Sequence, residues 1–102
     1  MGLTVSGTFT ADGTSDTHVV DSKIDVVGGF FMHVAGTFGG GTVKAQFLAD
    51  DGSWRDLANT SVTVASDKQI IVPNGFEVRL NLSGATSPSL YYQLSSMNYA
   101  RT

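Results

Sequence analysis

Any metal-binding or acid–base chemistry in this chain would depend on its two histidines, His18 and His33, because the chain has no cysteine. On an extended strand Asp16 and His18 would share one face, as two ligands of one metal ion must. Asp21 and Asp25 would lie on the opposite face, so the ligand set is incomplete. A polar strand that faces solvent or a partner explains these residues better, and we expect no metal and no other cofactor.

The chain has no local motif for nucleophilic catalysis. Serine is abundant, but no G-x-S-x-G segment presents a serine on the strand-to-helix turn that such a nucleophile needs. The absence of cysteine also excludes thiol nucleophiles and thiolate zinc sites. We therefore expect a protein that is not an enzyme. A small enzyme is the weakest alternative, and it would require that replacing one of the histidines abolishes turnover.

Two segments begin like ligand-binding loops without completing them. The sequence Asp50-Asp51-Gly52 opens as a calcium loop does, but the required ligand spacing and the closing glutamate are absent. The glycines at 39–41 are not followed by a helix N-terminus, which a phosphate-binding loop requires. Both segments are therefore predicted to be turns, and the glycines are predicted to close a hairpin between the runs 30–38 and 43–47.

The aromatic residues allow a binding function without catalysis. Trp54, together with Tyr91, Tyr92 and Tyr99, could form a platform on which sugar rings stack, as in carbohydrate-binding β-sandwiches. The other interpretation is that this single tryptophan, just after a turn, covers one end of the core. Phe31 and His33 lie on the strand face opposite the apolar residues Phe30 and Met32. Either both faces of that strand are covered or Phe31 meets another chain.

The elements that would position these residues are β-strands. Charged residues make up 15% of the chain, against about 25% in a typical domain. Threonine, serine and 12 glycines take their place, whereas helix surfaces are usually rich in Leu, Glu, Lys and Arg. Alternating or β-branched apolar runs occur at 3–10, 17–27, 30–38, 43–47, 61–65, 69–72, 76–84 and 89–95. A tight turn is predicted at 66–68, between two of these runs.

These runs predict an all-β fold, either an antiparallel β-sandwich or a jelly-roll-like barrel of about eight strands. With 102 residues, the chain is expected to form a single β-sandwich domain over residues 1–102, with a short C-terminal tail at 96–102. The alternation assigns core-facing side chains to the central and C-terminal runs: Phe30, Met32, Val34, Phe38, Val43, Ala45, Phe47, Phe76, Val78, Leu80, Leu82, Leu90, Tyr92 and Leu94.

Net charge and hydropathy exclude two classes of partner. The formal net charge is −3 and the pI is about 4.9, so the chain lacks the basic surface with which proteins bind a phosphate backbone. No run approaches the roughly 20 apolar residues of a membrane span, and the first residues have no signal-peptide pattern. We expect no nucleic-acid partner, no membrane partner and synthesis in a cytosol-like compartment.

One long part of the chain resembles the small virion structural proteins of tailed bacteriophages. In those proteins a G-T-F-G-G-x-T-V hairpin leads to a D-G-x-W turn and then to an R-L-x-L-x-G-A-T strand and loop. The resemblance covers residues 34–95 and is carried by Val34, residues 36–42, Gly52, Trp54, and residues 79–82 and 84–86.

The resemblance implies a capsid decoration (cement) protein, which binds the outer capsid surface in many copies. Its partners would be the major capsid protein and copies of itself, and its location would be the capsid surface of a virion made in the host cytoplasm. A head-fibre, neck or tail component is the alternative within the virion, and a carbohydrate-binding module is the alternative outside it. We expect partner contacts at Phe31, at the tail residues Met97, Tyr99 and Arg101, and along part of the N-terminal strand.

Overall fold

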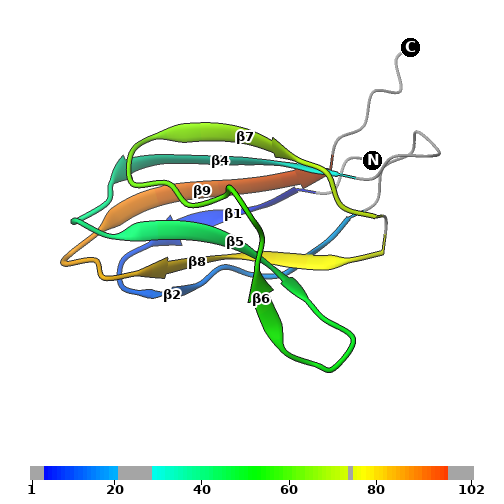
Figure 1. Ribbon diagram of the computed structural model, residues 1–102. Helices are drawn as coiled ribbons and strands as arrows, with labels where there is room; N and C mark the ends of the chain where they lie inside the picture. Colours follow the sequence, from blue (N-terminus) through cyan, green and yellow to red (C-terminus); the bar gives the residue numbers. More distant parts are fainter. Residues whose placement is uncertain (1–3, 21–28, 74, 97–102) are drawn as a thin grey trace, which may run out of the picture.

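Two antiparallel β-sheets pack face to face in the computed structural model, which describes residues 4–20, 29–73 and 75–96 (Figure 1). The four-stranded sheet has the order β1 (Thr4–Phe9), β9 (Ser89–Ser96), β4 (Phe30–Thr37) and β7 (Ser66–Ile70). The five-stranded sheet has the order β2 (Gly13–Thr14), β8 (Glu77–Ser83), β5 (Thr42–Leu48) and β6 (Trp54–Asp56), and β3 (His18–Val19) also pairs with β8. The predicted all-β antiparallel fold is confirmed, in the form of a sandwich.

The core lies between the sheets and is built by the alternation along each strand. In β4, Phe30 and Met32 are fully buried while Phe31 points away from the core, and β8 buries Val78 and Leu80 in the same way. The rings of Phe9 and Tyr92 pack at a centroid distance of 4.8 Å. The predicted core faces are confirmed except at two positions. Phe47 is only half-buried near the end of β5, and the prediction is wrong for Phe76, which precedes β8 and is 37% exposed.

The predicted hairpin between the runs 30–38 and 43–47 is wrong. β4 pairs with β9 and β7, whereas β5 pairs with β8 and β6, so the glycine-rich connection crosses from one sheet to the other. Each run has one apolar face, and both faces meet the same core from opposite sides. Alternation cannot distinguish this arrangement from a hairpin, because it reports which face is buried and not which strand lies alongside.

The crossing depends on glycine at two positions where backbones approach closely. Gly36 has φ 120°, and a Cβ there would lie 2.5 Å from the carbonyl oxygen of Ser89. Gly39 has φ 63°, and a Cβ there would lie 2.3 Å from the carbonyl oxygen of Thr86, whose N–H donates to Gly39 O at 2.9 Å. The crossing therefore packs against the loop at 84–88.

The tight turn predicted at 66–68 is also wrong. These residues belong to β7, in which Ser66 pairs with Val34 and Ile70 pairs with Phe30. The run 61–65 makes only an isolated bridge, between Val62 and Val43. Polar residues suited to a turn are accepted in β7 because it is an edge strand with one face in solvent, and tertiary pairing overrides the local preference.

The strand expected at 17–27 is described only at its start. His18 and Val19 form β3, and Val20, which follows them, is buried. The remaining positions of that run lie outside the described residues.

The described segments contain no helix of the length and hydrophobicity needed to cross a membrane.

Candidate functional site: the outer face of the four-stranded sheet

Three aromatic rings gather on the solvent-facing side of the four-stranded sheet. Phe31 and His33 alternate along β4, and Tyr91 stands on the adjacent strand β9. The rings of His33 and Tyr91 meet edge to face at a centroid distance of 6.0 Å, and Tyr91 is 41% exposed. The prediction that Phe31 points outward is confirmed.

We call this surface the contact face. It consists of the outward side chains of four neighbouring strands: Thr4, Ser6 and Thr8 of β1, Tyr91, Gln93 and Ser95 of β9, Phe31, His33 and Ala35 of β4, and Asp67 and Gln69 of β7. Asp67 is the only Asp, Glu, Lys or Arg in this set. Depletion of charge together with enrichment in aromatic residues is typical of the core of a protein–protein interface.

Hydrogen bonds hold the polar side chains of the contact face in place. The hydroxyl of Tyr91 donates to Oε1 of Gln93 at 3.2 Å, and Nε2 of Gln93 donates to Oγ of Ser95 at 3.0 Å. On the β7 side of the face, Nδ1 of His33 contacts Oδ1 of Asp67. These bonds order the side chains before any partner arrives, which lowers the entropic cost of binding.

Phe31 has polar neighbours on both sides. It pairs with Ser95 of β9 and with Gln69 of β7, so its ring stands between short or polar side chains and is half-buried. Among the described residues no other side chain covers the outward side of this ring, so a protein that docked on the contact face would bury more of its apolar surface. Sequence reasoning found Phe31 but not its association with His33 and Tyr91, which depends on the pairing of β4 with β9.

The other predicted contact residues cannot be compared with the structure. Met97, Tyr99 and Arg101 lie outside the described residues. Ser96, the first residue of the predicted tail, is instead the last residue of β9 and pairs with Phe30. The predicted tail boundary at residue 96 is therefore wrong by one residue, because Ser96 still belongs to the strand that carries Tyr91, Gln93 and Ser95.

The aromatic platform proposed for sugars is not assembled among the described residues. Trp54 lies on β6 of the five-stranded sheet, whereas Tyr91 lies on the outer side of the other sheet. Tyr92 points into the core, and Tyr99 is outside the described residues. The guanidinium of Arg79 lies 4.2 Å from the centre of the Trp54 ring, so one face of the indole is covered within the protein.

Arg79 belongs to a hydrogen-bonded row on the outer side of the five-stranded sheet. Its Nε donates to Oε1 of Gln46 at 3.0 Å, and Nε2 of Gln46 donates to Oδ1 of Asp56 at 2.9 Å. Nζ of Lys44 reaches the other carboxylate oxygen of Asp56 at 3.4 Å. The bond from Gln46 is the main cause that lowers the pKa of Asp56, and burial lowers the pKa of Arg79. These groups satisfy one another, so the row is structural.

The turn at 49–53 is confirmed as a hairpin turn between β5 and β6. The N–H of Gly52 donates to Ala49 O at 2.9 Å. The carboxylate of Asp51 accepts from the hydroxyl and the N–H of Ser53 and from Arg55, and these bonds, those of Ser53 first, lower its pKa. Because of these three bonds, the Asp51 carboxylate stabilises the turn.

The described residues contain no group of three or more His, Cys, Asp or Glu that could hold a metal ion.

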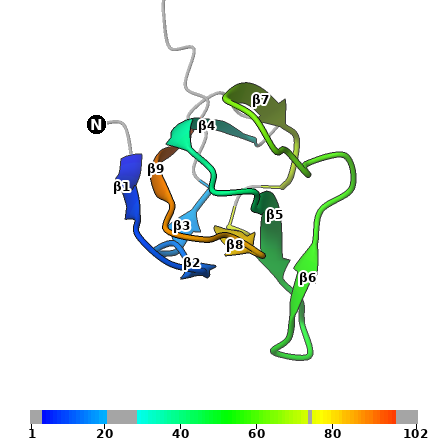
Figure 2. The ribbon, with the colours of Figure 1, turned by 90° about the vertical axis from the view of Figure 1, so that its left-hand side faces the viewer.

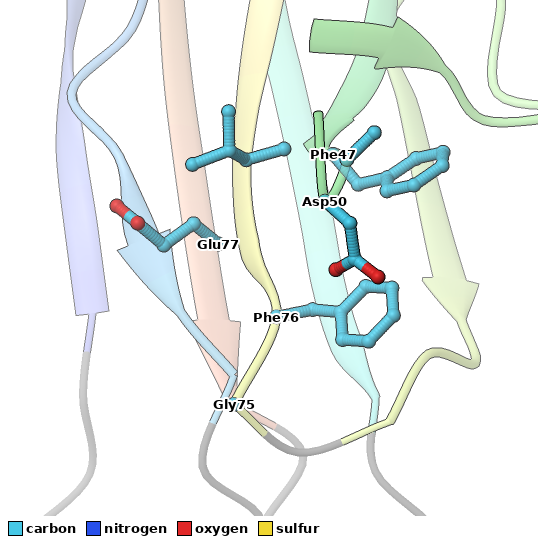
Figure 3. A pocket seen from close by; sticks show the side chains of 7 residues that line it. Phe47, Asp50, Gly75, Phe76 and Glu77 are labelled. Atoms are coloured by element: carbon cyan, nitrogen blue, oxygen red, sulfur yellow. The ribbon is translucent and has the colours of Figure 1, made fainter. Parts of the chain in front are cut away.

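A hollow of about 550 Å³ lies beside this turn, at the end of the five-stranded sheet. The rings of Phe47 and Phe76 line it, stacked at a centroid distance of 5.8 Å. Figure 3 shows the carboxylate of Asp50 beside the Phe76 ring and the side chain of Glu77 pointing away from it. Two carboxylates that point apart cannot share a proton or a cation, so the hollow carries no evident chemistry.

His18 is a core residue of β3 and not a surface ligand. It is 3% exposed and shares the buried side of its strand with Val20, while Asp16 is exposed. Burial lowers the pKa of His18 from its ordinary value of 6.5, because the interior disfavours the charged imidazolium. The imidazole is therefore neutral at neutral pH and contributes to packing.

The buried imidazole predicts loss of stability in mild acid. Below pH 6.5 the unfolded chain binds a proton at His18 that the folded chain does not, because the folded-state pKa is lower. Stability is complete above that value and falls as the pH drops toward the folded-state pKa, by at most about 1.4 kcal/mol per pH unit. Urea unfolding between about pH 7.5 and about pH 5 measures this slope. His18→Gln should flatten the slope, and an unchanged slope would contradict the assignment.

Comparison with known proteins yields no relative from which a function could be transferred: no protein-family model, no curated protein and no solved structure matches this chain.

Proposed function

We propose that this protein is a non-enzymatic structural component of a phage virion, a capsid decoration protein that binds the outer capsid surface in many copies. The contact face is the observation that carries the proposal. It is a sheet surface with three outward aromatic rings and a single Asp, Glu, Lys or Arg, ordered by internal hydrogen bonds. The resemblance of residues 34–95 to small phage virion proteins supplies the biological context.

A sheet surface of this kind favours binding to a protein over binding to a small molecule. Ligand sites are concave, with convergent polar groups, whereas Phe31 and Tyr91 stand on the outward side of neighbouring strands. A modest interface is sufficient in a lattice when linked copies bind together, because each further contact then forms at high effective concentration. The major capsid protein and other copies of this chain are the partners that we propose.

Binding to capsids tests the proposal through Phe31. The purified full chain is titrated onto capsids assembled from the major capsid protein of the same genome, and bound copies are counted by sedimentation and electron microscopy. Phe31→Ala should weaken binding about tenfold or more, because truncating a central aromatic contact costs above 1 kcal/mol. Val64→Ala is the matched control, since Val64 is 66% exposed and lies outside the contact face.

The outcomes are distinguishable. Saturable binding that Phe31→Ala weakens and Val64→Ala leaves unchanged supports the proposal. If the wild-type chain does not bind capsids, or if electron microscopy of the virion places it in the neck or tail, the decoration role is wrong. If both variants bind like the wild type, the contact face is not the capsid-binding surface.

A further inference from the structure

In the described part of the chain, β1 forms one edge of the four-stranded sheet. Among the described residues, β9 is the only strand that pairs with β1, and Figure 2 shows β1 at the margin of the molecule. The backbone N–H and C=O groups on the outer side of such a strand can pair with a strand of another chain. Natural proteins usually prevent this with very short edge strands, charged side chains, proline or bulges.

The other sheet edges carry these protective features. β7 contains Asp67 and Lys68, and Lys68 alternates with the outward side chains and so points toward the core side. β6 has three residues, of which Arg55 and Asp56 are charged. β2 and β3, on the remaining edge, have two residues each.

β1 has none of these features. It is six residues long, it pairs residue for residue with β9 without a bulge, and it contains no proline and no charged side chain. The first charged side chain in the sequence is that of Asp12, which follows the strand. The outward residues of β1, which are Thr4, Ser6 and Thr8, are small, exposed and able to form hydrogen bonds. An edge of this composition is suited to pairing with another strand.

We infer that β1 pairs antiparallel with β1 of a second copy of this chain, around a two-fold axis perpendicular to the sheet. When the axis passes midway between Ser6 of the two copies, these two residues face each other and Thr4 faces Thr8 of the other copy. Every cross-strand pair is then uncharged, and threonine and serine pairs are favourable. The same operation on β7, around its central residue, would place Lys68 opposite Lys68, which is destabilising.

The dimer joins the two four-stranded sheets into one continuous sheet of eight strands. The axis keeps both contact faces on the same side, so their aromatic rings would point toward one binding surface. Val5, half-buried in the single chain, gains cover from the second copy. Self-association does not depend on the capsid role. In that role, however, a dimer would make twice as many contacts with the capsid lattice as a single chain.

Charge placed on the β1 edge tests the inference. The mass of the full chain in solution is measured by light scattering and sedimentation over a concentration series. The wild type should reach twice the chain mass of 10.7 kDa. Ser6→Lys should raise the dimer dissociation constant about tenfold or more, because two lysines would face each other across the axis. Thr8→Lys is a second variant, and Gln69→Lys on the β7 edge is the matched control.

Each outcome supports or overturns the inference. A wild-type dimer that Ser6→Lys and Thr8→Lys dissociate, and that Gln69→Lys retains, supports it, provided that circular dichroism shows folded variants. A wild type that is monomeric at high micromolar concentration overturns it, as does a trimer or a dimer that the β1 variants leave intact. Because the measurement contains no capsid, failure of the capsid proposal would leave this result unchanged.

Discussion

Replacing Phe30 by alanine is expected to lower the free energy of unfolding by about 3–5 kcal/mol. The ring is fully buried between β7 and β9, where Phe30 pairs with Ile70 and Ser96. Its removal loses the transfer free energy of the ring and leaves a cavity that a sheet constrained on both sides cannot close. Urea denaturation measures the change. If the alanine variant does not fold, Phe30→Leu, with an expected cost of about 1 kcal/mol, keeps the measurement possible.

The adjacent residue is the matched control for this change. Phe31→Ala removes the same atoms from the other side of β4, where the ring is half-buried on the contact face. We expect a cost of about 1 kcal/mol or less, because the ring is half-buried and solvent can fill the space that it leaves. The same variant should weaken capsid binding, so the two phenylalanines separate stability from function. Equal costs for both variants would contradict the assignment of the two faces.

Replacing Gly39 by alanine is expected to cost about 3 kcal/mol. Its φ of 63° lies in the left-handed region, which costs a residue with a Cβ roughly 1–2 kcal/mol. The new Cβ would also lie 2.3 Å from the carbonyl oxygen of Thr86. The loop at 84–88 would have to move, with loss of the 2.9 Å hydrogen bond from Thr86 N–H to Gly39 O, which contributes about 1 kcal/mol.

Gly40 provides the control because it has the strained backbone without the steric conflict. Its φ is 81°, and a Cβ there would meet nothing within 4 Å. Gly40→Ala should therefore cost only the conformational penalty of roughly 1–2 kcal/mol. The difference between the two variants measures the contact between the crossing and the loop. If they are equally stable, the crossing does not depend on that contact.

The contact at Gly39 also explains why the sequence pattern wrongly predicted a hairpin between the runs 30–38 and 43–47. Glycines between two alternating runs are typical of a hairpin, and here they also allow a crossing between sheets. The distinguishing feature is the approach of the loop at 84–88, which is more than forty residues away in sequence. No local pattern contains that information, because the contact partner is chosen by the packing of the whole sandwich.

The contact face was predictable in part. The alternation along β4 placed Phe31 and His33 outward, and the alternation along β9 did the same for Tyr91. Their assembly into one surface required the pairing of Ala35 with Tyr91 and of His33 with Gln93. The aromatic residue types instead favoured a sugar-stacking platform of Trp54 and the tyrosines. In the structure, Trp54 and Tyr91 lie on different sheets and Tyr92 lies in the core.

The sequence by itself determined the strand class, the buried side of each main strand and the tight turn at 49–53. These features depend on the two-residue period of a strand and on local backbone chemistry, which neighbouring residues decide. Only the tertiary structure decided which strands lie side by side, that residues 66–68 belong to an edge strand, and that β1 is the other edge strand of the same sheet among the described residues. Strand pairing joins distant segments through backbone groups that every residue carries, so side-chain patterns in one segment cannot specify its partner.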